Sequence, residues 1–98
     1  MARPRGDQSH YYPVTTQSVA YTGTAGTITN AVGNYIQVVR VVCTSDAHIA
    51  IAVAPTATTS DLPVKADEVE YFSIKPGQKV SAIQQSAGGT LYVTEMTQ

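Results

Sequence analysis

The chain has little charge, one cysteine, no tryptophan and few of the residues that favour helices. Charged residues make up 13% of its 98 positions, with 6 basic against 7 acidic side chains. This balance provides no net field that would attract nucleic acid or an anionic lipid surface. We therefore predict no direct nucleic-acid partner and no membrane partner, and we expect solubility to depend on threonine, serine and glutamine.

The single cysteine, Cys43, excludes an intrachain disulfide. Its neighbours Val41 and Val42 predict a buried thiol that packs as a small hydrophobe. The longest apolar stretch, residues 49–54, is too short to cross a bilayer. The N-terminal sequence MARPRGDQSH contains no apolar segment of the kind that a signal peptide needs. We expect the chain to be made in a cytoplasm.

Residues that favour strands are abundant: 13 Thr and 12 Val, with 12 Ala, against 2 Leu and 3 Glu. A chain of this length buries enough surface for one core and not for two. Residues 1–10, which include Arg3 and Arg5, have no large apolar side chain beyond Met1 to offset the entropy cost of ordering. We therefore predict an extended N-terminal arm over residues 1–10 and a single all-β domain over residues 11–98.

Short strand-like segments alternate with turn signals at spacings near ten residues. The strongest segment, residues 35–43, is apolar on both faces, which is typical of a central strand. Others lie at 47–53, 68–74, 79–85 and 90–96, with weaker candidates at 12–21 and 26–32. About seven to eight antiparallel strands close one core as a β-sandwich or a jelly-roll-like barrel, and this is the predicted fold.

Three connections carry distinct predictions. Pro76-Gly77 fits a tight turn with proline second and glycine third, and residues 86–89 fit a hairpin loop. Residues 55–66 form a twelve-residue loop candidate, long enough to be functional or to cross between sheets. Within it, Leu62 and Val64 flank a proline and could pin the loop to the core or to a partner.

Metal-binding patterns are missing from the sequence. There are two histidines and one cysteine, without CxxC, HxxxH or HExxH spacing. The acidic residues Asp67, Glu68 and Glu70 lack the alternating carboxylates and central glycine of a calcium loop, and they fit a solvated strand entrance. We predict no metal site and no cofactor.

One arrangement invites a catalytic interpretation. Asp46 and His48 would point the same way from an extended strand and could form a hydrogen-bonded pair. No nucleophile accompanies them, because the valine-rich surroundings of Cys43 would raise its pKa. We predict a protein that is not an enzyme and has no catalytic residues.

The sequence therefore favours binding or assembly. Tyrosine is enriched at protein interfaces, arginine pairs with carboxylates, and exposed apolar loop residues can anchor a partner. The candidate partner-binding residues are Arg3, Arg5, Tyr11, Tyr12, Leu62 and Val64.

Two segments carry a resemblance to a known group of proteins. They are VVRVVCTSDAHIAIAVAPTATTSD and EYFSIKPGQKVSAIQQSAGGTLYVTEMT, together spanning roughly residues 38–97. The phrases His-Ile-Ala, Pro-Thr-Ala-Thr, Tyr-Phe-Ser-Ile-Lys-Pro-Gly and Gly-Thr-Leu-Tyr-Val-Thr-Glu resemble small virion proteins of tailed bacteriophages, especially short-tailed ones. These motifs are strands and turns without catalytic groups.

The resemblance implies a structural virion protein, most simply a head decoration or cement protein that binds the outside of the major capsid shell and stabilises it. It would be made in the host bacterial cytoplasm and located on the capsid surface, with the major capsid protein as partner. Such proteins are generally β-rich and form dimers or trimers, so we expect a homo-oligomer.

Two alternatives remain. One is a head–tail junction or tail-fibre attachment protein, which copy number per virion would distinguish. The other is a soluble module that binds carbohydrate on a cell surface through Tyr11, Tyr12 and the loop at 55–66. Against the second, sugar sites usually pair an exposed aromatic with clustered Asp, Asn or Glu, and the chain has no tryptophan.

Overall fold

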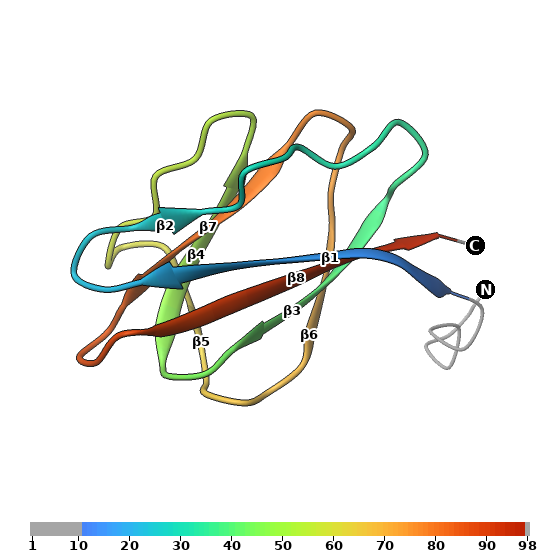
Figure 1. Cartoon of the computed structure of the whole chain (residues 1–98). Coiled ribbons are helices and arrows are strands. Elements are labelled where there is room, and N and C mark those ends of the chain that lie inside the picture. The colour runs from blue at the N-terminus through green and yellow to red at the C-terminus, as the bar shows by residue number, and fades with distance from the viewer. Residues whose placement is uncertain (1–10, 98) are drawn as a thin grey trace.

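The computed structural model describes residues 11–97. This part of the chain contains eight strands, joined by turns and loops, and no helix (Figure 1). The prediction of an all-β fold is confirmed, and the strands form two antiparallel sheets of four. The predicted arm, residues 1–10, lies outside the described residues together with Arg3 and Arg5.

Each sheet combines strands from both halves of the chain. Sheet A has the order β1 (Tyr12–Tyr21), β8 (Gly89–Thr97), β3 (Val38–Cys43) and β6 (Glu70–Ser73). Sheet B has the order β2 (Gly26–Thr27), β7 (Lys79–Gln84), β4 (Ala47–Ala52) and β5 (Leu62–Val64). Most consecutive strands therefore lie in different sheets, and many contacts join distant parts of the sequence.

The pairing of the strands is nested. β1 pairs with β8, β2 with β7, β3 with β6 and β4 with β5, all antiparallel. Two further pairings, β3 with β8 and β4 with β7, join these pairs into the two sheets. The chain thus behaves as one long hairpin, closed at the β4–β5 connection and folded so that its strand pairs alternate between sheets A and B.

The core lies between the sheets. In β3 the side chains of Val39, Val41 and Cys43 are buried, whereas their alternating neighbours are half-buried. This period of two follows from the pleat, which points successive side chains to opposite faces. The main buried apolar residues around them are Tyr21, Ile28, Val32, Ile36, Ala47, Ile49, Val80, Ala82, Leu91 and Val93.

The strand predicted over residues 35–43 is a central strand, between β8 and β6, but it begins only at Val38. Before it, the Ile36 N–H donates to the Gly33 carbonyl at 3.2 Å, which closes a turn around Asn34 and Tyr35. The side chain of Tyr35 is consequently 88% exposed. The apolar alternation of the sequence extends over residues 35–37, but the turn keeps these residues out of the regular strand.

The segment predicted as a strand over 26–32 pairs as a strand only at Gly26–Thr27. Beyond it, the Ile28 N–H donates to the Val80 carbonyl at 3.1 Å and the Val32 N–H to the Gln78 carbonyl at 3.0 Å. Both apolar side chains are buried. The alternating pattern therefore reports burial against the core, while regular strand pairing stops after two residues.

The predicted loop over 55–66 contains a short edge strand, β5, in which Pro63 pairs opposite His48. An edge strand tolerates proline because one side of its backbone needs no ladder partner. Earlier in the loop, the Ala57 N–H donates to Ser81 Oγ at 3.0 Å, and Thr27 Oγ1 donates to the Pro55 carbonyl at 3.2 Å. These contacts hold the loop against sheet B and bury Ser81 fully.

The turn at Pro76-Gly77 is confirmed, with Gly77 at a φ of 88° and the Gln78 N–H donating to the Lys75 carbonyl at 3.1 Å. The hairpin predicted at 86–89 is wrong, because β7 belongs to sheet B and β8 to sheet A. The small residues there permit a tight reversal, but the strands on either side find their partners elsewhere. The connection crosses between the sheets.

Candidate interaction surface

The residues considered for chemistry are engaged in structural contacts. Asp46 Oδ1 accepts the Ala66 N–H at 2.8 Å, whereas His48 Nδ1 lies 3.0 Å from the Asp61 carbonyl oxygen. The hydrogen-bonded pair between Asp46 and His48 is therefore not formed. Instead, each side chain holds a different part of the 55–66 loop. The backbone groups of the loop need hydrogen-bond partners where they lie against β4, and the side chains of Asp46 and His48 supply them.

Cys43 is buried, as predicted, with 1% of its surface exposed. Burial raises the pKa of its thiol to about 11, because the thiolate would lose its hydration there, while the nearby Tyr21 hydroxyl opposes this shift. Between residues 11 and 97, no group of three or more His, Cys, Asp or Glu side chains is placed to hold a metal ion. Over the same residues, no helix is long and apolar enough to span a membrane.

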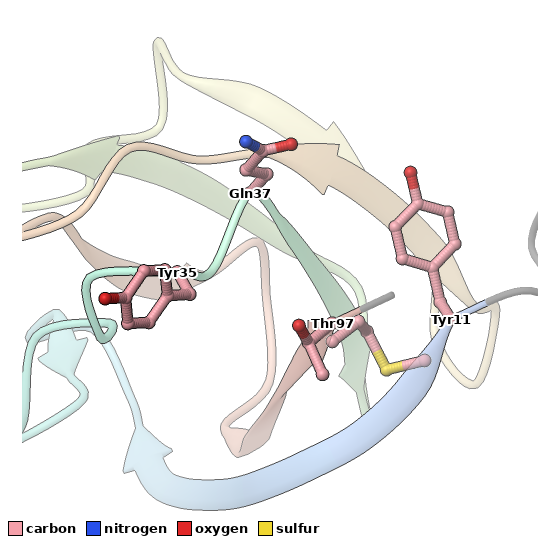
Figure 2. A pocket seen from close by; sticks show the side chains of 5 residues that line it. Tyr11, Tyr35, Gln37 and Thr97 are labelled. Atoms are coloured by element: carbon pink, nitrogen blue, oxygen red, sulfur yellow. The ribbon is translucent and has the colours of Figure 1, made fainter.

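A pocket of about 130 Å³ lies at one end of the molecule and is lined by Tyr11, Tyr35, Gln37, Met96 and Thr97 (Figure 2). We call it the terminal pocket. Its residues come from the start of β1, the end of β8 and the segment before β3. The pairing explains why they meet, since Tyr12 lies opposite Thr97 and Met96 lies opposite both Pro13 and Val38.

The residues that line the terminal pocket are uncharged, and exposed aromatic and apolar side chains lie in it and beside it. Tyr35 is 88% exposed and Tyr12 is 65% exposed, and Val14 of the same strand is also exposed. In Figure 2 the Tyr11 and Tyr35 rings flank Gln37 and Thr97 from two sides. A tyrosine offers both an apolar ring and a hydroxyl, which is why such side chains are enriched at protein interfaces. This end of the molecule is suited to binding a partner that presents apolar and polar uncharged groups.

The candidate partner residues that the structure describes fall into three places. Tyr11 lines the terminal pocket and Tyr12 lies beside it on β1. Leu62 is 51% exposed but lies on β5, the edge of the other sheet. Val64, 7% exposed, belongs to the hydrophobic core. Of the two roles considered for the loop apolar residues, Val64 therefore has the first, pinning the loop to the core.

Tyr35 and Gln37 were missed as candidates because the sequence pattern assigned them to a strand. The signal that could have found Tyr35 is the Gly33-Asn34 pair directly before it. These two residues favour turns, and an aromatic side chain within a turn is exposed unless another segment covers it.

Comparison of the chain with protein-family models, with curated proteins and with solved structures returned no match.

Proposed function

We propose that this protein is a structural component of a tailed-bacteriophage virion, a decoration or cement protein that binds the outer surface of the major capsid shell and stabilises it. The observation that carries the proposal is the terminal pocket, which is lined by uncharged residues and has exposed tyrosines in it and beside it. The sequence resemblance over residues 38–97 supplies the identity of the partner.

Binding at the terminal pocket would be reinforced by the segment that precedes it. Residues 1–10 join the chain at Tyr11, which lines the pocket, so the predicted arm would extend from the contact surface itself. Arg3 and Arg5 would then meet carboxylates on a capsid subunit. A segment that orders on binding wraps a large surface at modest affinity. Many copies that bind the assembled shell preferentially shift the assembly equilibrium toward it.

The finer form of the fold that we propose is a jelly roll. Its support is the nested pairing of β1 with β8, β2 with β7, β3 with β6 and β4 with β5, which alternates between the two sheets. Eight strands distributed over two sheets in this manner are a common design of viral capsid domains and of lectins.

The test is the copy number and position of the chain in purified virions, by quantitative mass spectrometry and cryo-electron microscopy. Hundreds of copies over the shell would support the decoration role. About a dozen copies at one vertex would instead support the head–tail junction or tail-fibre attachment alternative, and absence from the particle would contradict both.

A variant locates the contact. Tyr35→Ala removes a side chain that is 88% exposed, so the fold should be unaffected while binding to capsid shells weakens by about tenfold or more, as at an aromatic hot spot. The control is Val53→Ala, which truncates an exposed side chain on the β4–β5 connection. Deleting residues 2–9 should also weaken shell binding while leaving Tm unchanged. Equal binding by all three variants would exclude the terminal pocket and the arm as the contact.

The carbohydrate-binding alternative is favoured by one feature, the two tyrosines and the Gln37 amide that line a single pocket. Aromatic faces and amide groups can contact the two faces and the hydroxyls of a sugar ring. A glycan array with Tyr35→Ala as the control would detect such binding, and an array without signal would remove this alternative.

A further inference from the structure

The four sheet edges of the described chain are unequal. In sheet B the edge strands are β2, with two residues, and β5, with three residues that include Pro63. In sheet A one edge is β6, four residues long and beginning at Glu70. The other is β1, with ten residues. Short length, proline and charge are the usual ways in which proteins prevent edge strands from pairing with other chains, and three of the four edges use them.

β1 has almost none of these protections. Residues 12–21 read YPVTTQSVAY and contain no charged side chain, and only Pro13, near one end, interrupts the series of N–H donors. Most of the strand is exposed, including every residue from Tyr12 to Thr16. At its far end the Ala20 carbonyl lies against Gly26, where an added Cβ would come within 2.1 Å of that oxygen. The open edge therefore runs from Tyr12 to Val19.

The open edge is held in a regular conformation by its neighbours. β1 pairs with β8 along its whole length, with one irregularity between Pro13 and Thr15 (Figure 1). On the inner face, the Gln17 side chain donates to the Asn30 carbonyl at 2.9 Å and accepts the Asn30 N–H at 3.0 Å. No strand among residues 11–97 pairs with the other side of β1. A row of backbone donors and acceptors is thus presented in order, at little further entropy cost to a chain that pairs with it.

We infer that this edge pairs with β1 of a second copy of the chain, antiparallel about a two-fold axis, so that two copies of sheet A form one continuous eight-stranded sheet. A two-fold interface brings the edge against a copy of itself, so charges of one sign close to the axis would face like charges. β1 is neutral and avoids this conflict. The outer face of the open edge carries the small side chains of Thr16 and Ser18, so that two such edges can approach closely.

Residues 1–10 of a neighbouring copy are a poorer occupant of the edge. They contain Pro4, Gly6 and Asp7, which are all depleted in strands. The inference does not rest on the proposed function, because it concerns the protein alone in solution.

The experiment measures the mass of the full chain by light scattering and native mass spectrometry over a wide range of micromolar concentrations. We expect a dimer in equilibrium with a monomer. Thr16→Lys combined with Ser18→Lys places two cations on the outer face of the edge, and the corresponding pair of glutamate substitutions places two anions there. Each double variant should raise the dimer Kd by about tenfold or more, because like charges would face one another.

The decisive measurement uses a mixture of the two double variants. Lysine and glutamate variants combined in equal amounts should form heterodimers with a Kd near that of the unsubstituted chain, since opposite charges then face across the two-fold axis. The control, Ser73→Lys with Thr59→Lys, adds the same charge at exposed positions on β6 and on the β4–β5 connection and should leave the dimer intact. Circular dichroism checks that every variant is folded.

Several results would overturn the inference. They are a monomer at every concentration, a trimer, double variants that dimerise as tightly as the unsubstituted chain, and a mixture that fails to restore the dimer. A control variant that dissociates as readily as the lysine variant would also overturn it, by showing that net charge rather than the β1 edge decides association.

Discussion

Tyr21 and Ser45 together join three segments that are distant in the sequence. Its hydroxyl donates to the Ser45 carbonyl at 2.6 Å and accepts the Ser45 N–H at 3.1 Å. Ser45 Oγ in turn donates toward the Ala87 carbonyl at 2.9 Å and the Gly88 carbonyl at 3.0 Å. The end of β1, the β3–β4 turn and the crossing between the sheets are thereby joined through two side chains.

Tyr21→Phe should reduce the free energy of unfolding by about 1–2 kcal/mol, because the partly buried N–H and carbonyl of Ser45 would lose their partner. The measurement is chemical denaturation, with Tyr12→Phe as the control, since Tyr12 is exposed. A loss of the same size in both variants would mean that the Ser45 contacts contribute nothing specific.

Because the thiol of Cys43 is buried, we expect the free energy of unfolding to fall at alkaline pH. Burial raises the pKa of its thiol from 9.0 to about 11, and burial also raises the pKa of the adjacent Tyr21 hydroxyl. The folded state therefore holds these protons more tightly than the unfolded state. The resulting stabilisation is complete below pH 9 and declines as the pH rises through 11.

Denaturation midpoints measured at a series of pH values up to 11 should decrease over this window. The decrease should be smaller in Cys43→Ala, which retains only the Tyr21 contribution. In the native protein, Cys43 should also resist thiol reagents at neutral pH. Rapid labelling without unfolding would contradict the buried placement.

At the scale of elements, the turn between β6 and β7 depends on one glycine. Gly77 has a φ of 88°, and a Cβ added there would meet nothing within 4 Å. The cost of Gly77→Ala therefore comes from the local backbone conformation and should be about 1–2 kcal/mol, without a clash against other parts of the protein. Thermal unfolding measures it, and Gly23→Ala, where the nearest atom belongs to a flexible glutamine side chain, is the control. An unchanged Tm for Gly77→Ala would show that the turn can relax at no cost.

The elements also differ in how well their sequences predict them. β3 was clear because its side chains alternate against the core, with three of its six residues fully buried. β7 was also clear, although its three fully buried residues, Val80, Ser81 and Ala82, are consecutive. β1 was a weak candidate, yet it is the longest strand. Its N-terminal half is exposed on both faces, so the alternation that marks a half-buried strand is missing there, and pairing with β8 maintains it.

At the scale of the whole molecule, Val41 and Ile51 differ in how deeply they lie in the core. Val41 is 1% exposed at the centre of sheet A, whereas Ile51 is half-buried and packs at the margin of the core. Truncation to alanine should cost on the order of 1–5 kcal/mol, with Val41→Ala near the middle of this range and Ile51→Ala near its lower end. Urea denaturation of both variants measures the difference. A larger cost at Ile51 than at Val41 would contradict this placement of the core.

The candidate site required the assembled chain. Tyr11 and Tyr12 could be named from the sequence, but the contribution of Tyr35 depended on a turn, and Met96 joined them only because β8 lies between β1 and β3. No local pattern contains this information, since the lining residues come from both ends of the chain and the segment before β3. Val64 was a candidate until packing against the core removed it from the surface.

By itself, the amino-acid sequence determined that the protein is all-β, where most strands lie, which turn needs glycine and that Cys43 is buried. These features depend on local backbone preferences and on a side-chain period of two, both of which a short segment carries. Only the tertiary structure decided which strands pair, that the 86–89 connection crosses between sheets, and that one edge remains long, neutral and open. Those outcomes depend on contacts between residues far apart in the chain, where every segment competes for the same partners.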